Sequence, residues 1–259
     1  MKSQLVAIAL LSAAVSIGNA AGDSPFTGTW KMNQEKSKLA GDTMSFASAG
    51  AGGLRYTDST QSYTFTTDGK KATTPTGSTV AWKQSGDKTW ENTSTRNGML
   101  MVTNTWKLSD DEKTLTVDSK GTKPNGENFS DTAVYSRTAG AKGITGSWVS
   151  KEIKLSAPNT LGLKPNGDDG LMLEISEMKA TVGTKFDGKD YPAKGPTVPE
   201  GITLALTKTG PRSFKMVEKM RGKIITLGQY EVSADGKTMT QKDTDAMGKE
   251  PSTIVWEKE

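Results

Sequence analysis

Apolar and polar side chains alternate through most of the chain after the N-terminal segment. Between Trp90 and Arg96, and again between Met99 and Leu108, every second residue falls on the same side of an extended backbone. Asn97-Gly98 separates these two runs and is typical of a tight hairpin turn. A period of two, interrupted by turn residues every ~8–12 positions, predicts antiparallel strands, and no stretch shows a helical period.

The same order of landmarks occurs twice along the chain. Phe26–Trp30 returns as Ile144–Trp148, and the closing segment Ala133–Arg137 returns as Ile254–Lys258. The landmarks keep the same order in both halves, and the number of residues between equivalent landmarks changes only slowly along the chain. A duplication followed by loop insertions leaves this pattern. We therefore predict a signal peptide at 1–21, a first β-barrel repeat at 22–138, a linker at 139–143 and a second β-barrel repeat at 144–259.

Each repeat is expected to contain about seven or eight strands. An open sheet of that size leaves two strand edges unpaired, whereas closure into a barrel pairs them. The predicted fold class is therefore all-β, with two tandem antiparallel up-and-down barrels.

A Gly-x-Trp motif opens both repeats, as Gly28-Thr29-Trp30 and as Gly146-Ser147-Trp148. This motif resembles the signature of lipocalins and related calycin barrels, and the opening of the first repeat is similar to uncharacterised secreted bacterial lipocalin-like proteins. In such barrels the Trp packs across the base beneath a basic residue near the last strand, which corresponds here to Arg137 and Lys258. The resemblance implies a ligand cavity without identifying the ligand.

The N-terminus has the features of a secretory signal. Lys2 precedes an apolar run from Leu5 to Ile17, and small residues follow at Ala20 and Ala21. We expect export to the periplasm or the exterior, without a lipoprotein anchor because the chain has no cysteine. We expect no transmembrane segment, because no later run approaches about 20 apolar residues.

Composition narrows the possible chemistry. The formal net charge of +4 comes from lysines interspersed with acidic residues rather than from a basic stripe, so nucleic acid is not an expected partner. The chain has no histidine and no cysteine, which removes the usual ligands of zinc, copper, haem and iron–sulfur clusters and the usual nucleophile–base pairs. We therefore expect no cofactor, no metal and no enzymatic activity.

The candidate ligand residues share strand faces with aromatic residues. The aromatic residues indicate that these faces point into the barrels. They are Asn92, Arg96, Asn104, Trp106, Met216, Glu218 and Tyr230. Two other interpretations remain open: each barrel is filled by its own side chains, or the faces are inverted, so that Asn92 and Glu218 contact water.

These features predict an exported, non-enzymatic protein that binds a small hydrophobic or amphipathic molecule inside a barrel. One alternative is a structural or interaction protein with filled barrels and a protein partner in the bacterial envelope. A less favoured alternative is a barrel isomerase or hydrolase that uses Glu218 or a tyrosine as its acid–base group.

Overall fold

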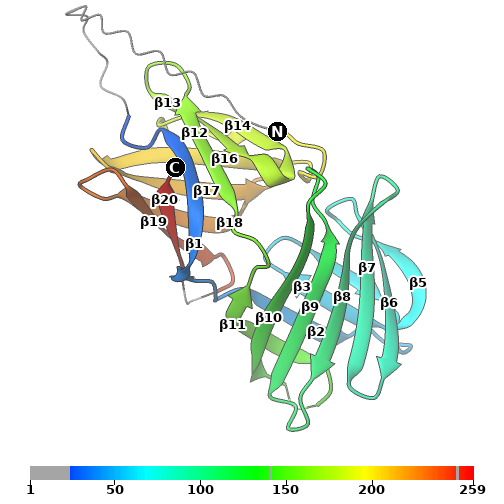
Figure 1. Cartoon of the computed structure of the whole chain (residues 1–259). Coiled ribbons are helices and arrows are strands. Elements are labelled where there is room, and N and C mark those ends of the chain that lie inside the picture. The colour runs from blue at the N-terminus through cyan, green and yellow to red at the C-terminus, as the bar shows by residue number, and fades with distance from the viewer. Residues whose placement is uncertain (1–23, 141, 249–250) are drawn as a thin grey trace, which may run out of the picture.

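The computed structural model describes residues 24–140, 142–248 and 251–259, so the predicted signal peptide and Ala141 of the predicted linker lie outside the described residues. Two ten-stranded antiparallel sheets, each nearly closed, account for the fold (Figure 1). The predicted all-β class with two up-and-down barrels is therefore confirmed. A single 3-10 turn, η1 (Ser176–Met178), is the only helical element of the described residues.

The two sheets are called the first and second barrels. The first barrel consists of β2 (Thr43–Ser48), β3 (Leu54–Asp58), β4 (Ser62–Phe65), β5 (Asp68–Thr73), β6 (Thr79–Gly86), β7 (Thr89–Arg96), β8 (Met99–Leu108), β9 (Thr114–Thr122), β10 (Asn128–Ala139) and β11 (Gly146–Lys154). The second barrel consists of β1 (Gly28–Lys38), β12 (Thr160–Pro165), β13 (Gly170–Ile175), β14 (Ala180–Lys185), β15 (Tyr191–Pro192), β16 (Ile202–Gly210), β17 (Ser213–Met220), β18 (Lys223–Val232), β19 (Thr238–Asp245) and β20 (Ser252–Lys258).

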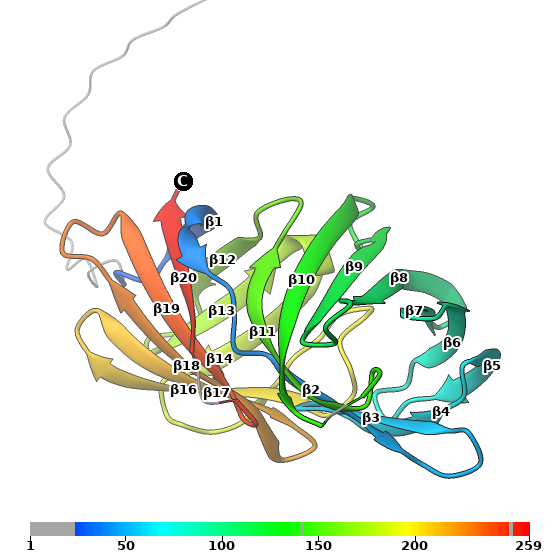
Figure 2. The same ribbon diagram turned by 90° about the horizontal axis from the view of Figure 1, so that it is seen from below.

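The first strand of each sequence repeat belongs to the barrel of the other repeat. β1 lies between β20 and β12, and β11 lies between β10 and β2 (Figure 2). The predicted ranges 22–138 and 144–259 therefore do not describe how the strands are grouped. The first barrel is a continuous segment, 43–154, inserted between β1 and the rest of the second barrel.

Local connections explain this grouping. A short link after Ala139 lets β11 turn back beside β10 as an antiparallel hairpin, with Arg137 opposite Trp148. β11 then occupies the place that the equivalent strand β1 would otherwise take. The segment 39–42 instead carries the chain from β1 across to the first barrel.

The two crossing segments, 39–42 and 155–159, lie against neighbouring strand residues at the junction. Ser150 is the centre of one set of contacts: its N–H donates to Asp42 O at 2.8 Å, and its Oγ accepts from Asp42 N at 2.9 Å. On the other side, Met32 N donates to Asn159 O at 3.0 Å. These bonds satisfy backbone groups that would otherwise be left unpaired where the chain leaves each sheet.

The tryptophan of each Gly-x-Trp motif is completely buried and covered by a cation. Arg137 Cζ lies 4.2 Å from the ring centre of Trp148, and Lys258 Nζ lies 5.3 Å from that of Trp30. Both tryptophans are thus covered by the expected basic residues, but the partners are exchanged, because each cation covers the tryptophan of the other sequence repeat. The glycine two residues before the tryptophan is required by the backbone. Gly146 has φ +134°, and an added Cβ would lie 2.3 Å from Ala139 O.

Candidate functional site

Aromatic side chains occupy the interior of the first barrel. The rings of Phe65 and Trp82 stack with centroids 4.5 Å apart, and Trp82 and Trp106 lie 5.0 Å apart. Phe46 meets the Trp106 ring edge-on at 5.7 Å. This packing corresponds to the interpretation in which a barrel is filled by its own side chains.

Three of the predicted ligand residues meet inside this aromatic core. Asn92 Oδ1 accepts hydrogen bonds from Trp106 Nε1 at 2.6 Å and from Asn104 Nδ2 at 3.1 Å. Asn92 is only 5% exposed, so its face points inward as predicted and the inverted arrangement does not apply. Because these polar groups satisfy one another, they do not need a ligand to pair with.

Arg96 lies apart from these three residues, at the end of β7. Its guanidinium donates to Thr76 O at 2.6 Å and to Ser78 Oγ at 3.3 Å within the first barrel. It also donates to Thr197 O in the segment between β15 and β16 of the second barrel. Arg96 therefore connects the two barrels.

The second barrel contains a cavity of about 640 Å³. Met216, Glu218 and Tyr230, the three predicted residues of the second repeat, all line it. Most of the wall is apolar and includes Leu161, Leu173, Val182, Leu204, Ile225 and Trp256.

The two barrels differ in the size of their interior side chains at one layer. In the first barrel, Trp82 pairs with Asn92, and Asn92 with Asn104. At the corresponding positions of the second barrel, Leu206 pairs with Met216, and Met216 with Gly228. Leucine and glycine replace a tryptophan and an asparagine, so much less side-chain volume enters the interior.

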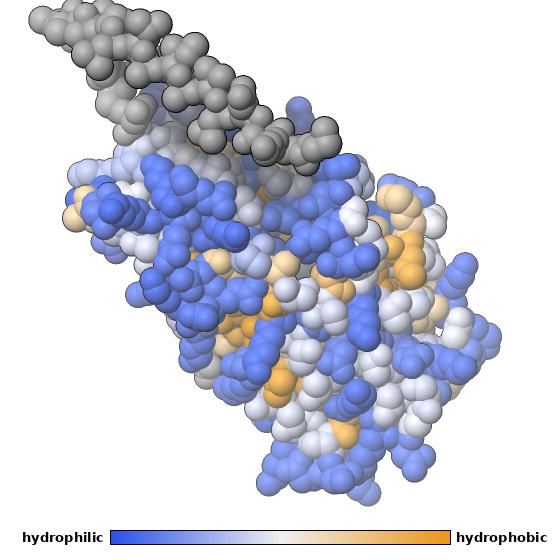
Figure 3. All heavy atoms as spheres, in the orientation of Figure 1, coloured by the Kyte–Doolittle hydropathy of each residue, from blue (hydrophilic) through white to orange (hydrophobic). Residues whose placement is uncertain are grey.

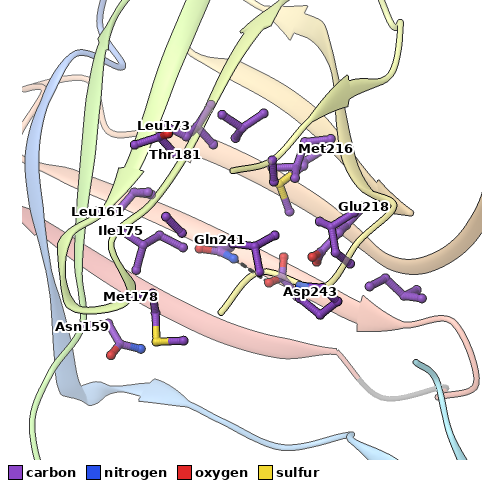
Figure 4. Close-up of a pocket in the computed structure, with 18 of the residues that line it drawn as sticks. Asn159, Leu161, Leu173, Ile175, Met178, Thr181, Met216, Glu218, Gln241 and Asp243 are labelled. Atoms are coloured by element: carbon purple, nitrogen blue, oxygen red, sulfur yellow. Dashed lines mark hydrogen bonds between the residues drawn. The ribbon is translucent and has the colours of Figure 1, made fainter. Parts of the chain in front are cut away.

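A polar cluster stands on one side of the cavity. Trp256 Nε1 donates to Gln241 Oε1 at 2.8 Å, and Gln241 Nε2 donates to Asp243 Oδ2 at 2.5 Å. Asp243 Oδ1 is buried without a hydrogen-bond partner. Figure 4 shows Glu218, Gln241 and Asp243 close together, with Leu161, Leu173 and Ile175 across the cavity from them.

Gly228 makes room for this cluster. An added Cβ at Gly228 would lie 2.8 Å from Asp243 Oδ1 and 2.9 Å from Tyr230 Cε2. The missing side chain therefore allows the Asp243 carboxyl to reach the cavity from β19. Gln241 and Asp243 were not among the predicted site residues, although the period of two along β19 places Met239, Gln241 and Asp243 on one face and could have identified both.

Burial shifts the ionisation of these side chains. The pKa of Asp243 is raised to about 6, mainly by burial and also by the charges of Glu218 and Asp42, while the hydrogen bond from Gln241 opposes the shift. Burial also raises the pKa of Glu218, and it raises that of Tyr230 well above the usual value. None of the described residues that line the cavity is a lysine or an arginine, so no wall residue supplies a compensating positive charge.

Turns of the first barrel cover part of the opening of this cavity. Thr60, Gln61 and Thr76, from turns of the first barrel, contribute to the lining together with Thr197 and Pro199 of the second. The Arg96 hydrogen bond to Thr197 O holds the segment at this opening. The contact between the barrels therefore borders the cavity, and the partly exposed Ile175 and Met178 line it as well.

A second cavity, of about 480 Å³, lies at the junction of the barrels and shares Asp243 with the first. Asp42, Asp58 and Asp245 also line it. Burial, followed by the charges of Asp245 and Asp58, raises the pKa of Asp42 to about 6. Within the described ranges, no group of three or more His, Cys, Asp or Glu side chains is arranged to hold a metal ion.

On the face shown in Figure 3, hydrophilic side chains predominate over both barrels, and apolar side chains form small separate patches. In the part of the chain that the structure describes, no helix combines the length and apolar character needed to cross a membrane. Comparisons with protein-family models, with curated proteins and with solved structures found no match to this chain.

Proposed function

We propose that this chain is a non-enzymatic binding protein that holds one small amphipathic molecule in the second barrel. The observation that carries the proposal is the cavity of about 640 Å³, which has apolar walls and one polar cluster. Ligand sites typically measure about 300–1,000 Å³ and combine an apolar lining with a few polar groups that orient the ligand. Apolar walls favour an apolar ligand body, and the polar cluster favours a polar group at one end.

The first barrel has a supporting role in this proposal. Its aromatic interior is packed, and its turns cover part of the opening of the second barrel. The duplicated barrels have therefore diverged into a filled unit and a hollow unit. The resemblance of the Gly-x-Trp motifs to lipocalin-like proteins supports a binding role, and the signal-like N-terminus supports a periplasmic or secreted location.

A neutral apolar fluorophore tests the proposal. N-phenyl-1-naphthylamine is expected to bind the mature chain with one site and a rise in fluorescence. Leu173→Phe and Val182→Phe add volume to the cavity wall and should weaken binding strongly, because the occupied space is no longer free.

Leu227→Phe is the matched control for these two substitutions. Leu227 is 46% exposed and lies on the outer face of β18, so this variant should bind the fluorophore as the wild type does. Equal binding by all the variants would contradict a site inside the second barrel. Circular dichroism and thermal melts establish that each variant is folded.

A further inference from the structure

The wall of the cavity carries an unbalanced charge. Glu218 and Asp243 both face the interior, and no described residue of the lining carries a positive charge. Asp243 Oδ1 has no partner although it is buried. A buried carboxylate without a compensating donor is unfavourable, so a ligand that supplies donors there gains binding energy that an apolar molecule does not.

Strand register brings the two carboxyls toward the same space. Glu218 on β17 and Asp243 on β19 are separated by β18, where Glu218 pairs with Thr226 and Asp243 pairs with Gly228. Gly228 has no side chain to stand between them. Glu218 and Asp243 therefore line the same cavity, and Figure 4 shows them close together.

We propose that the ligand carries a protonated primary amine, which lies between Glu218 and Asp243 while its apolar chain lies along the leucine-rich wall. This inference rests on the proposed binding function and specifies the ligand's polar end. An ammonium group has three donors and no acceptor, which suits two carboxylates and an unpartnered Asp243 oxygen.

The ionisation behaviour of the site is consistent with this chemistry. Burial raises the pKa of both carboxyls, and the hydrogen bonds from Thr226 to Glu218 and from Gln241 to Asp243 offset this shift only in part. A carboxylate ligand would add a third negative charge to the same apolar space. A cation instead lowers the cost of ionising both side chains.

Three ligands with the same ten-carbon chain test the head group: 1-aminodecane, 1-decanol and decanoate. The affinity of each compound is measured by its displacement of N-phenyl-1-naphthylamine from the mature chain at about pH 7.5. Each compound is used below its own critical micelle concentration. We expect 1-aminodecane to bind about tenfold more tightly than 1-decanol, as a charge-assisted hydrogen bond predicts, and decanoate to bind most weakly.

Neutral side chains test the role of the carboxyls. Glu218→Gln and Asp243→Asn, singly and together, should remove the preference for the amine while leaving the affinity for 1-decanol within about twofold. Glu231→Gln is the matched control, because Glu231 is exposed on the outer face of β18. The single Glu218→Gln variant leaves the Gln241–Asp243 hydrogen bond in place, so the test remains valid if Asp243→Asn disturbs folding.

The outcomes separate the two proposals. Tight binding of decanoate, equal binding of all three compounds, or an amine preference that survives in the double variant would overturn the amine inference while leaving a binding barrel. Failure of the fluorophore and all three compounds to bind would overturn the proposed function itself.

Discussion

Lys258 lies over the ring of Trp30, with Nζ 5.3 Å from the ring centre, although the two residues belong to different sequence repeats. Arg137 and Trp148 show the reciprocal arrangement in the first barrel. The exchange of β1 and β11 produces both contacts, because the strand that carries each tryptophan belongs to the barrel of the other repeat. The fold is therefore one barrel inserted into another rather than two barrels in series.

An isolated first barrel should fold without the rest of the chain. The segment 43–154 contains all ten strands of that barrel in continuous order, together with the Arg137–Trp148 contact. We expect this fragment to be monomeric in size-exclusion chromatography and to unfold cooperatively in urea. A fragment without a cooperative transition would contradict the strand grouping.

Asn92 is expected to stabilise the first barrel without contributing to ligand binding. Asn92→Ala leaves the buried Trp106 N–H without its acceptor, which should lower the free energy of unfolding by about 1–3 kcal/mol. Urea titration measures this change, and the exposed control Asn128→Ala should stay within about 0.5 kcal/mol of the wild type. Fluorophore affinity should be the same in all three proteins, and a loss of affinity in Asn92→Ala would place a ligand in the first barrel.

The junction between the barrels should make stability depend on pH. The pKa of Asp42 is about 6 in the folded protein and about 3.9 in an unfolded chain. Between these values the folded state binds more protons, so the free energy of unfolding falls as the pH rises from about 4 to about 6 and then levels off. Asp243, whose pKa is also raised to about 6, contributes in the same direction.

Asp42→Asn tests this dependence because it removes one titrating carboxyl. The variant should be more stable than the wild type near neutral pH and should show a shallower fall across the same window, measured by urea unfolding at several pH values. Asp110→Asn is the control, since the Asp110 side chain is fully exposed. An unchanged pH profile in Asp42→Asn would show that this carboxyl does not destabilise the junction.

Arg96 is expected to control the rate of ligand exchange. Arg96→Ala removes the hydrogen bond to Thr197 O and so releases the segment over the cavity opening. Loss of a charged hydrogen bond should make opening of this segment about tenfold more frequent. Fluorophore association and dissociation should therefore both accelerate in stopped-flow experiments, and Kd should change little. The exposed variant Arg55→Ala is the control, and unchanged rates in Arg96→Ala would exclude a role for this contact in access.

The strands were predictable because they depend on a local pattern, whereas the cation-covered tryptophans were expected only from the resemblance of the Gly-x-Trp motif, and with the partners exchanged. The exchange of β1 and β11 was not predictable in this way. Both strands begin with the same Gly-x-Trp motif, so either one suits either barrel, and the outcome depends on the crossing segments and on the hairpin between β10 and β11.

The candidate site was predictable only in part. The alternation on β7, β8, β17 and β18 correctly placed Asn92, Trp106, Met216 and Tyr230 inside the barrels. It did not distinguish a filled barrel from a hollow one, because that depends on the summed volumes of side chains from many strands, such as Trp82 in one barrel and Leu206 in the other. The role of Arg96 depends on a contact between barrels that no local pattern encodes.

The most direct test of the account is to locate a bound ligand by photolabelling. A long-chain primary amine with a diazirine in its apolar chain is irradiated with the mature protein, and labelled peptides are identified by mass spectrometry, with 1-aminodecane as competitor. A ligand held in the second barrel should give competable labels on cavity residues such as Leu173, Met216 and Ile225. Competable labels on the aromatic core of the first barrel, at residues such as Trp82 and Trp106, would contradict it.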